Sequence, residues 1–239
     1  MKNFIVSNDK AFWKLDSEEM FKFIIEEFSS KELNQNLDIC DAGCANGEFL
    51  YYLDTKSNFN LHGIDILHQL IKKAKEFVPN VKYKQGDIQD KKMYNKNQFD
   101  VVFLTGVHSI FDEYENLFDN LIEWTKDNGK VIITGLFNPF PIDVFIKYKK
   151  SGSKSSYFES GWNMFSIDSI SNFLSKNKKV KSFSFDKFKI NIDLDKKPDI
   201  VRSWTTKDSN DNRFITNGLS IIQNHYRLVI NIQKIETDN

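Results

Sequence analysis

Hydrophobic residues in the first 135 positions follow two alternating patterns. Short apolar runs, typical of strands covered on both faces, alternate with stretches in which apolar residues recur three or four positions apart, as on one face of a helix. This alternation predicts an α/β fold built on a Rossmann-like, doubly wound parallel sheet with right-handed crossovers. The predicted strands are residues 37–42, 61–65, 81–84, 99–104 and 130–134, and the predicted helices are residues 20–28, 48–53, 67–77 and 117–124.

The pattern changes after Gly135, where Pro139 and Pro141 interrupt it. From that point the spacing of apolar residues predicts two short helices and two later strands. The predicted helices are residues 142–148 and 166–174, and the predicted strands are residues 180–190 and 226–232.

Residues 191–224 interrupt the chain before the last predicted strand. Turn-forming residues within 204–218 predict a small hairpin there. A connection of this length inside a compact domain is usually a lid or a binding element. We therefore expect residues 138–165 and 191–224, together with the N-terminal segment, to form a cap over the sheet.

The stretch that organises the chain is residues 37–50, LDICDAGCANGEFL. It reads as a buried strand, a turn bracketed by Gly43 and Gly47, and the start of a helix whose first N–H groups are free to meet a ligand. The spacing is G-x-A-x-G, which differs from the G-x-G-x-x-G fingerprint of dinucleotide sites. Asp41 stands two residues before the first Gly, where a carboxylate repels a phosphate and favours an ammonium or sulfonium group.

Polar residues end each of the next strands as well. Asp65 ends the second strand, about twenty residues after the glycine loop, where an acid accepts hydrogen bonds from ribose hydroxyls. Asp87 follows the third strand, and residues 105–108 follow the fourth. An acid at a strand end can equally cap the following helix, so each one alone is ambiguous. Together, and in this order, they predict a nucleoside site along the carboxyl edge of the sheet.

Composition limits the classes of partner. The formal net charge is zero, which argues against nucleic acid and against an anionic membrane as partners, and leaves a local charged patch as the alternative. The two cysteines, Cys40 and Cys44, flank the glycine loop and are expected to be free thiols in a reducing compartment. The N-terminus has no signal-peptide pattern, and no apolar stretch is long enough to span a bilayer, so we expect a cytoplasmic protein.

Residues 37–135 resemble class I S-adenosylmethionine (SAM)-dependent methyltransferases, whose first motif is D-x-G-x-G-x-G. Ala45 replaces the middle Gly of that motif. The resemblance implies SAM as cofactor, with the methionine end at the glycine loop, the ribose at Asp65 and the adenine at Asp87. The residues implied to bind the cofactor are Asp41, Gly43, Cys44, Ala45, Gly47, Asp65, Ile66, Asp87, Ile88 and Thr105, with Ile66 and Ile88 on either side of the adenine.

The same resemblance implies a seven-stranded sheet with an antiparallel last strand and a single domain, residues 1–239. Within it, residues 1–36 would form a cap segment and helix, residues 37–135 the cofactor-binding core, and residues 136–239 a C-terminal half with the cap insertions 138–165 and 191–224. The segment before the last strand also resembles methyltransferases of surface-polysaccharide gene clusters. This favours a hydroxyl of a sugar, or of a similar small polar metabolite, as the methyl acceptor.

His108 is the best candidate for a general base, because it lies at the end of the fourth strand. The alternative is that it only packs beside the cofactor. No carboxylate and histidine cluster has the spacing of a metal site, so we expect no metal. The candidates for binding the acceptor are Phe12, Trp13, Trp162, Trp204, Arg213 and Asn217, although core packing is the rival role for the tryptophans.

Three further readings remain open. Asn138, Pro139 and Phe140 resemble the N-P-P-[YF] motif of methyltransferases that modify amide or base nitrogens, but they follow the fifth predicted strand rather than the fourth. The loop spacing and Asp41 disfavour a nicotinamide-dependent oxidoreductase. A SAM-binding module without transfer activity is the third alternative, and the oligomeric state is left undetermined by the sequence.

Overall fold

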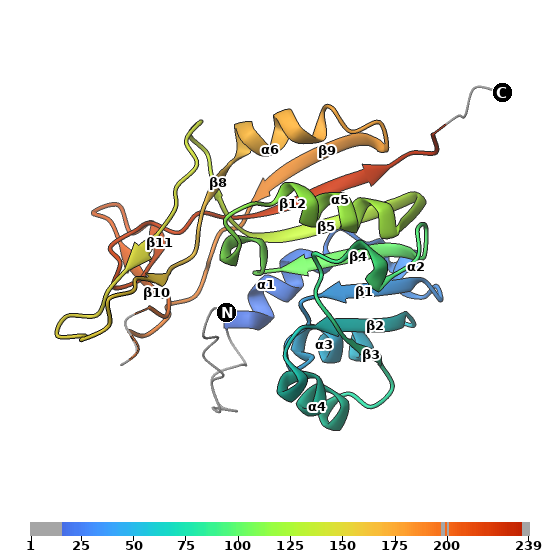
Figure 1. Cartoon of the computed structure of the whole chain (residues 1–239), viewed down its shortest axis with the longest axis horizontal. Coiled ribbons are helices and arrows are strands. Elements are labelled where there is room, and N and C mark those ends of the chain that lie inside the picture. The colour runs from blue at the N-terminus through green and yellow to red at the C-terminus, as the bar shows by residue number, and fades with distance from the viewer. Residues whose placement is uncertain (1–15, 197–198, 200, 236–239) are drawn as a thin grey trace.

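The main sheet has eight strands. Seven follow the order β3–β2–β1–β4–β5–β12–β9, which runs from bottom to top in Figure 1, and the short β8 (Phe165–Ser166) pairs with the end of β5. The structure is a computed structural model that describes residues 16–196, 199 and 201–235. Strands β1 to β5 are parallel to one another, and β12 is antiparallel to both of its neighbours. The strands are β1 (Asp38–Ala42), β2 (Asn60–Asp65), β3 (Lys82–Gln85), β4 (Phe99–Thr105), β5 (Thr125–Asn138), β9 (Val180–Lys187) and β12 (His225–Ile232).

This order confirms the predicted α/β fold with its antiparallel last strand. The parallel strands point to the left in Figure 1 and their carboxyl ends share one edge of the sheet. Asp65 and residues 105–108 therefore lie near the glycine loop, although they are distant from it in sequence.

Helices cover both faces of the sheet, which gives the protein two hydrophobic cores. Successive residues of β4 face opposite cores: Val101 and Phe103 pack with α1 and α3, and Val102 and Leu104 pack with α5 and α6. A strand buried on both faces must be apolar throughout, which is why the sequence pattern identified it. The helices are α1 (Asp16–Ile25), α2 (Ser30–Leu33), α3 (Glu48–Lys56), α4 (His68–Phe77), α5 (Glu115–Trp124) and α6 (Ile167–Leu174), with short 3-10 turns η1 (Lys91–Met93) and η2 (His108–Ile110).

Strand β5 is longer than predicted at both ends. Asn128 and Gly129 form a dipeptide that usually marks a turn, but here it is an irregularity within the strand, where Asn128 takes a left-handed φ of 64°. The register between β4 and β5 shifts at this point. Asn is one of the few non-glycine residues that adopt this conformation readily, so the turn signal was correct but its consequence was a bulge.

The helix predicted for residues 142–148 is wrong. This segment is extended: Val144 bridges Met164, and β6 (Lys147–Tyr148) pairs antiparallel with β7 (Glu159–Ser160). Ile142, Val144 and Ile146 are β-branched and favour extended backbone, and a preceding proline supplies no helical hydrogen bond. The helical spacing of the apolar residues was therefore accidental.

The cap stands beyond the carboxyl ends of the parallel strands (Figure 1). It contains the β6–β7 hairpin, β8 (Phe165–Ser166), and the predicted hairpin, which is present as β10 (Trp204–Lys207) and β11 (Arg213–Thr216).

Asn163 fastens the first cap segment to the sheet. Its side chain is fully buried and donates to the Phe111 carbonyl oxygen over 2.7 Å and to an Asp112 carboxylate oxygen over 2.9 Å. Its amide oxygen accepts from the backbone N–H of Ile146 over 3.0 Å. The cap is thus tied by buried hydrogen bonds to the loop that follows β4. Among the helices that the structure describes, none has the length and apolarity needed to cross a bilayer.

Candidate active site

The loop between β1 and α3 is folded tightly against the ends of the neighbouring strands. Gly43 and Gly47 have φ angles of 81° and 84°, which side chains rarely allow. The backbone N–H groups of Gly43 and Cys44 both donate to the Ile64 carbonyl oxygen, over 2.7 and 2.9 Å. A Cβ at Gly43 would come within 2.7 Å of Val107, so the exit of β4 contacts the loop directly.

Ala45 occupies a strained position in this loop. Its φ is 47°, in the left-handed region where a Cβ costs about 1–2 kcal/mol. The loop therefore keeps the conformation of an all-glycine motif, although the middle position carries a methyl group.

Asp65 holds the loop in this conformation. One carboxylate oxygen accepts from the backbone N–H of Ala45 over 3.0 Å, and the other accepts from the backbone N–H of Leu67 over 2.8 Å. The predicted ribose-binding acid thus joins the loop after β1 to the loop after β2. Each of its oxygens keeps a second lone pair available for a hydroxyl donor.

Two carboxyl groups beside the loop each have one buried oxygen without a hydrogen-bond partner among the described residues. Asp41 is 3% exposed, and its Oδ1 has no hydrogen-bond partner among the described residues. Burial, reinforced by the charge of Asp65, raises the pKa of Asp41 to about 7. Glu48, at the start of α3, also buries an unpartnered Oε1, and burial raises its pKa to about 8. A cation bound beside these two carboxyl groups would be stabilised by their negative charge when they ionise.

Sequence reasoning missed Glu48, because an acid in the first turn of a helix is expected from the helix dipole alone. Its burial depends on the packing around α3, and the local sequence carries no signal of that. Tyr83 was missed for the same reason; its hydroxyl is buried without a partner beneath Gly47.

Of the residues predicted to border the adenine, two are exposed at the surface and one is buried in the core. Asp87 is exposed and accepts from the Gln89 backbone N–H, and Ile66 is half exposed. Ile88 instead belongs to the core, where its carbonyl oxygen accepts from the buried Asn120 side chain over 3.0 Å. Thr105 lies at the end of β4 with its hydroxyl buried and unpartnered.

Cys44 is buried in the loop, and burial raises its pKa, so the thiol is protonated and unreactive.

His108 is fully buried and not open to a substrate in this conformation. Its Nε2 lies 2.9 Å from the Leu136 carbonyl oxygen, to which it donates, and its ring stacks on Phe137 with centroids 4.5 Å apart. Burial lowers the pKa of His108 to about 4, so the ring is neutral near pH 7. This geometry favours the packing role over the base role.

Comparisons with known proteins agree with this arrangement. The protein family described as "Methyltransferase domain" matches residues 33–138, from the helix before β1 to the end of β5. The part of the chain that carries the glycine loop and the parallel strands is therefore similar to a methyltransferase domain, and its sheet order supports the predicted likeness to class I SAM-dependent methyltransferases.

The chain is 29% identical over 111 residues to phosphoethanolamine N-methyltransferase of Plasmodium falciparum. The match covers 44% of this chain and 41% of the relative, so the chain spans about two fifths of the length of the curated relative it matches.

Two solved structures share the fold at lower identity. Phosphoethanolamine N-methyltransferase 2 of Haemonchus contortus, in complex with SAM, superposes with a TM-score of 0.58 at 14% identity, over 90% of this chain and 52% of the other. A Listeria monocytogenes protein assigned to the SAM-dependent methyltransferases gives 0.60 at 12% identity, over 92% and 100%. These likenesses describe the fold.

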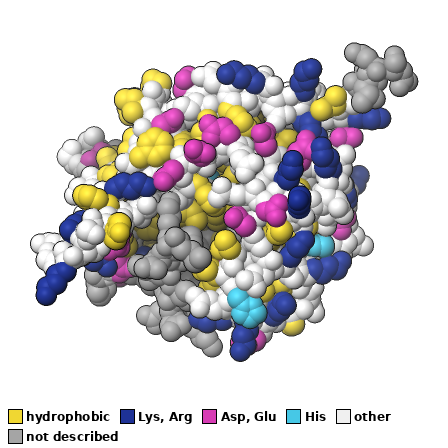
Figure 2. Space-filling model, viewed as in Figure 1, with side chains coloured by type: hydrophobic (Ala, Val, Ile, Leu, Met, Phe, Trp, Pro, Cys, Tyr) yellow, Lys and Arg dark blue, Asp and Glu magenta, His cyan; other side chains and the backbone are white. Residues whose placement is uncertain are grey.

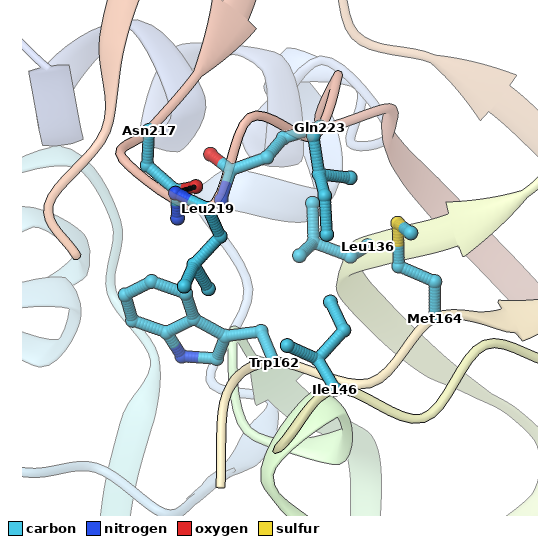
Figure 3. A pocket seen from close by; sticks show the side chains of 8 residues that line it. Leu136, Ile146, Trp162, Met164, Asn217, Leu219 and Gln223 are labelled. Carbon is cyan, nitrogen blue, oxygen red and sulfur yellow. Dashed lines mark hydrogen bonds between the residues drawn. The ribbon is translucent and has the colours of Figure 1, made fainter. Parts of the chain in front are cut away.

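The sheet and the cap border a small hollow beyond the end of β5, drawn in Figure 3. Its cavity volume is about 10 Å³, about the space of one water molecule, and the rest of the depression is open to solvent. Trp162 and Asn217, both predicted to bind the acceptor, lie on its wall. The lining residues are Leu136, Ile146, Trp162, Met164, Asn217, Leu219, Ile221 and Gln223.

The other predicted acceptor residues lie elsewhere. Arg213 is held by the exposed Asp193, with Nε 2.8 Å from Oδ1. Trp204 does not line the hollow; Lys196 covers its ring at 5.2 Å from the centroid. Phe12 and Trp13 lie outside the described residues. No group of three or more His, Cys, Asp or Glu side chains able to hold a metal occurs among the residues that the structure describes.

We predict that Ala45→Gly stabilises the ligand-free protein by about 0.5–1 kcal/mol, because relief of left-handed strain exceeds the added entropy of the unfolded chain. Equilibrium urea unfolding measures this difference. Ala42→Gly, at the buried carboxyl end of β1, is the matched control and should destabilise. Equal destabilisation by both changes would show that Ala45 is unstrained.

We also predict that SAM binds more tightly as the pH rises from about 6 to about 8. The raised pKa values of Asp41 and Glu48 mean that the free site holds protons at the lower pH, and a cation must displace them. The same shifts make the ligand-free protein lose stability as the pH rises through them. Calorimetry in buffers of different ionisation enthalpy counts the released protons.

Asp41→Asn is the control for this effect, because it removes one titrating group at nearly constant shape. The variant should release fewer protons than the wild type. A dissociation constant independent of pH in the wild type would contradict the assignment.

Proposed function

We propose that this protein transfers a methyl group from SAM to a small-molecule acceptor held beneath its cap. The observation that supports this most strongly is the edge formed by Asp41, the glycine loop and Asp65. The buried Asp41 carboxylate has an oxygen without a partner among the described residues, and Asp65 fixes the loop beside it by accepting from the backbone N–H of Ala45. A phosphate-binding loop lacks such a charge, and a purely structural turn has no reason to bear its desolvation cost.

In this proposal Asp41 and Glu48 offer negative charge to the methionine end of the cofactor. Asp65 accepts from the ribose hydroxyls, and Ile66 and Asp87 border the adenine. When bound, SAM supplies a methyl group that its sulfonium centre already activates. The tasks left to the protein are to align the acceptor with that methyl group and to exclude water.

The hollow supports an uncharged acceptor. Its lining is apolar except for two amides, those of Asn217 and Gln223. Asn217 uses its amide within the cap, donating to Val201 and accepting from Leu219. Gln223 accepts from Ser203 over 2.6 Å, which leaves its Nε2 as a free donor among the described contacts. One free amide donor beside Trp162 suits a hydroxyl on a sugar or a similar polar molecule.

His108 takes a positioning role in this account. It anchors the Leu136 carbonyl, and Leu136 forms part of the hollow's wall. A neutral, buried ring beneath the wall can hold it in place without exchanging a proton with the acceptor.

An amine acceptor is the second candidate, because the relatives include phosphoethanolamine N-methyltransferases. A phosphorylated amine would require a cation in the acceptor pocket, and among the described residues that line the hollow none is Lys or Arg. The polysaccharide pathway suggested by the sequence is one setting for a hydroxyl acceptor. A SAM-binding module without transfer remains the inactive alternative.

The test is turnover, measured as formation of S-adenosylhomocysteine, with neutral hydroxylated compounds and with phosphoethanolamine. We predict turnover with a neutral hydroxyl compound and none with phosphoethanolamine. Trp162→Ala and Gln223→Ala should raise the acceptor KM by roughly tenfold or more, the effect of losing a packed aromatic or one hydrogen bond in a pocket.

Trp204→Ala is the matched control, because it removes a tryptophan of the cap that does not line the hollow. It should leave KM near the wild-type value. SAM affinity should change little in all three variants, since the two sites are separate. Turnover of phosphoethanolamine alone would favour the amine acceptor, and SAM binding without turnover of any acceptor would favour the inactive module.

A further inference from the structure

The β6–β7 hairpin and the residues that lead into it expose an unusual number of large hydrophobic side chains. Phe140, Phe158 and Tyr157 are 68%, 66% and 81% exposed, and Ile142 and Phe145 are more than half exposed. Large apolar groups gathered in one surface segment commonly mark an interaction site. In Figure 2 hydrophobic side chains gather with Lys and Arg side chains at the left end of the molecule, where the cap lies.

The turn of this hairpin is basic. Residues 149–156, KKSGSKSS, contain three lysines and no acid. No ion pair involves Lys149, Lys150 or Lys154 among the described residues, whereas Lys147 pairs with Asp112. The nearby acids are engaged elsewhere: Glu159 accepts from the Tyr148 hydroxyl over 2.9 Å, and Asp143 accepts from Ser166 and Ser169.

Strand pairing places these two kinds of side chain together. Lys147 is opposite Ser160 and Tyr148 is opposite Glu159. Residues 149–158 connect the two strands, so Lys149 directly follows β6 and Phe158 directly precedes β7. Aromatic rings and unpaired ammonium groups thus share the tip of one protruding hairpin.

We propose that this hairpin docks the protein onto the surface of an anionic membrane. Exposed aromatic rings enter the boundary between headgroups and acyl chains, and lysines beside them meet anionic headgroups. Each lysine near such a surface contributes on its own, and the apolar side chains provide the second signal that stable binding needs. Protein–protein interfaces, in contrast, are depleted in lysine.

The net charge of zero predicted no membrane partner, but it averages over the whole chain. Electrostatic attraction to a surface is screened within about 10 Å, so the local cluster decides.

Docking in this way would also orient the cap. The hairpin is attached at both ends to the hollow's wall, since Ile146 precedes β6 and Trp162 follows β7. The backbone N–H of Gly161 donates to the Ile146 carbonyl oxygen over 2.8 Å, which joins the two ends. The hollow would then lie beside the membrane surface. The docking itself stands independently of the proposed reaction.

Sedimentation with vesicles tests the inference. The full chain should bind phosphatidylcholine vesicles that contain about 30% phosphatidylserine, and should bind pure phosphatidylcholine vesicles much more weakly. Replacing Lys149, Lys150 and Lys154 together by Ser should lower the partition constant roughly a hundredfold. Tyr157→Ser with Phe158→Ser should lower it roughly tenfold or more.

Matched controls come from the α3–α4 surface, which exposes the same side-chain types. Lys56, Lys72 and Lys75 replaced by Ser, and separately Tyr51→Ser with Phe77→Ser, should leave vesicle binding near the wild-type value. Circular dichroism verifies that every variant is folded.

Three results would overturn the proposal. One is the absence of wild-type binding to anionic vesicles, and another is equal loss in the control variants. The third is self-association of the wild type, measured by light scattering, in the absence of vesicle binding. If the hairpin variants abolish that self-association, the hairpin is a protein interface.

Discussion

The candidate active site depends on the hydrogen bonds that Asp65 makes to two backbone N–H groups. They fix the loop after β1 against the loop after β2, and they hold Ala45 in a left-handed conformation that it would not adopt alone. The clamp also brings a second carboxylate near Asp41, which adds to the cost of burying that side chain. The edge of the sheet is therefore fixed in shape and lined by carboxyl groups whose ionisation a bound cation would favour.

Strain and uncompensated charge are concentrated at this edge. Sequences that specify one fold generally avoid a left-handed Ala and a buried acid without a partner, and exceptions are most frequent at functional sites. The two hydrophobic cores on the faces of the sheet supply the stability that such a site requires. A bound cation would remove part of the cost by compensating Asp41 and Glu48, so cofactor and fold should stabilise each other.

The part of the site formed by the strands and by the residues directly after them was predictable from the sequence. Strands such as β4 are buried on both faces and are apolar along their centre, from Val101 to Leu104, and the residues after them meet at one edge because the sheet is parallel. The parallel part of the fold and the place of Asp65 follow from this, whereas the antiparallel last strand was implied by the resemblance to methyltransferases. The residues that bind the cofactor remain a prediction.

The cap was less predictable because long-range contacts determine it. Residues 142–148 pair with a strand that lies across the hairpin, and helical spacing could not reveal this pairing. The buried hydrogen bonds of Asn163 and the burial of Glu48 and His108 arise from packing between distant segments. Arg213 and Trp204 looked suited to an acceptor, yet neighbouring charged side chains of the cap engage both.

The central claim is that the carboxylate of Asp41 selects a cationic nucleoside. Calorimetric titration of the wild type and of Asp41→Asn tests it most directly, with three ligands: SAM, NAD and 5′-methylthioadenosine, which keeps the nucleoside but lacks both cationic groups. The account predicts saturable SAM binding, no NAD binding, and a loss on substitution of roughly tenfold or more for SAM alone, as expected for a hydrogen-bonded charge. Saturable NAD binding, or equal loss for SAM and 5′-methylthioadenosine, would contradict it.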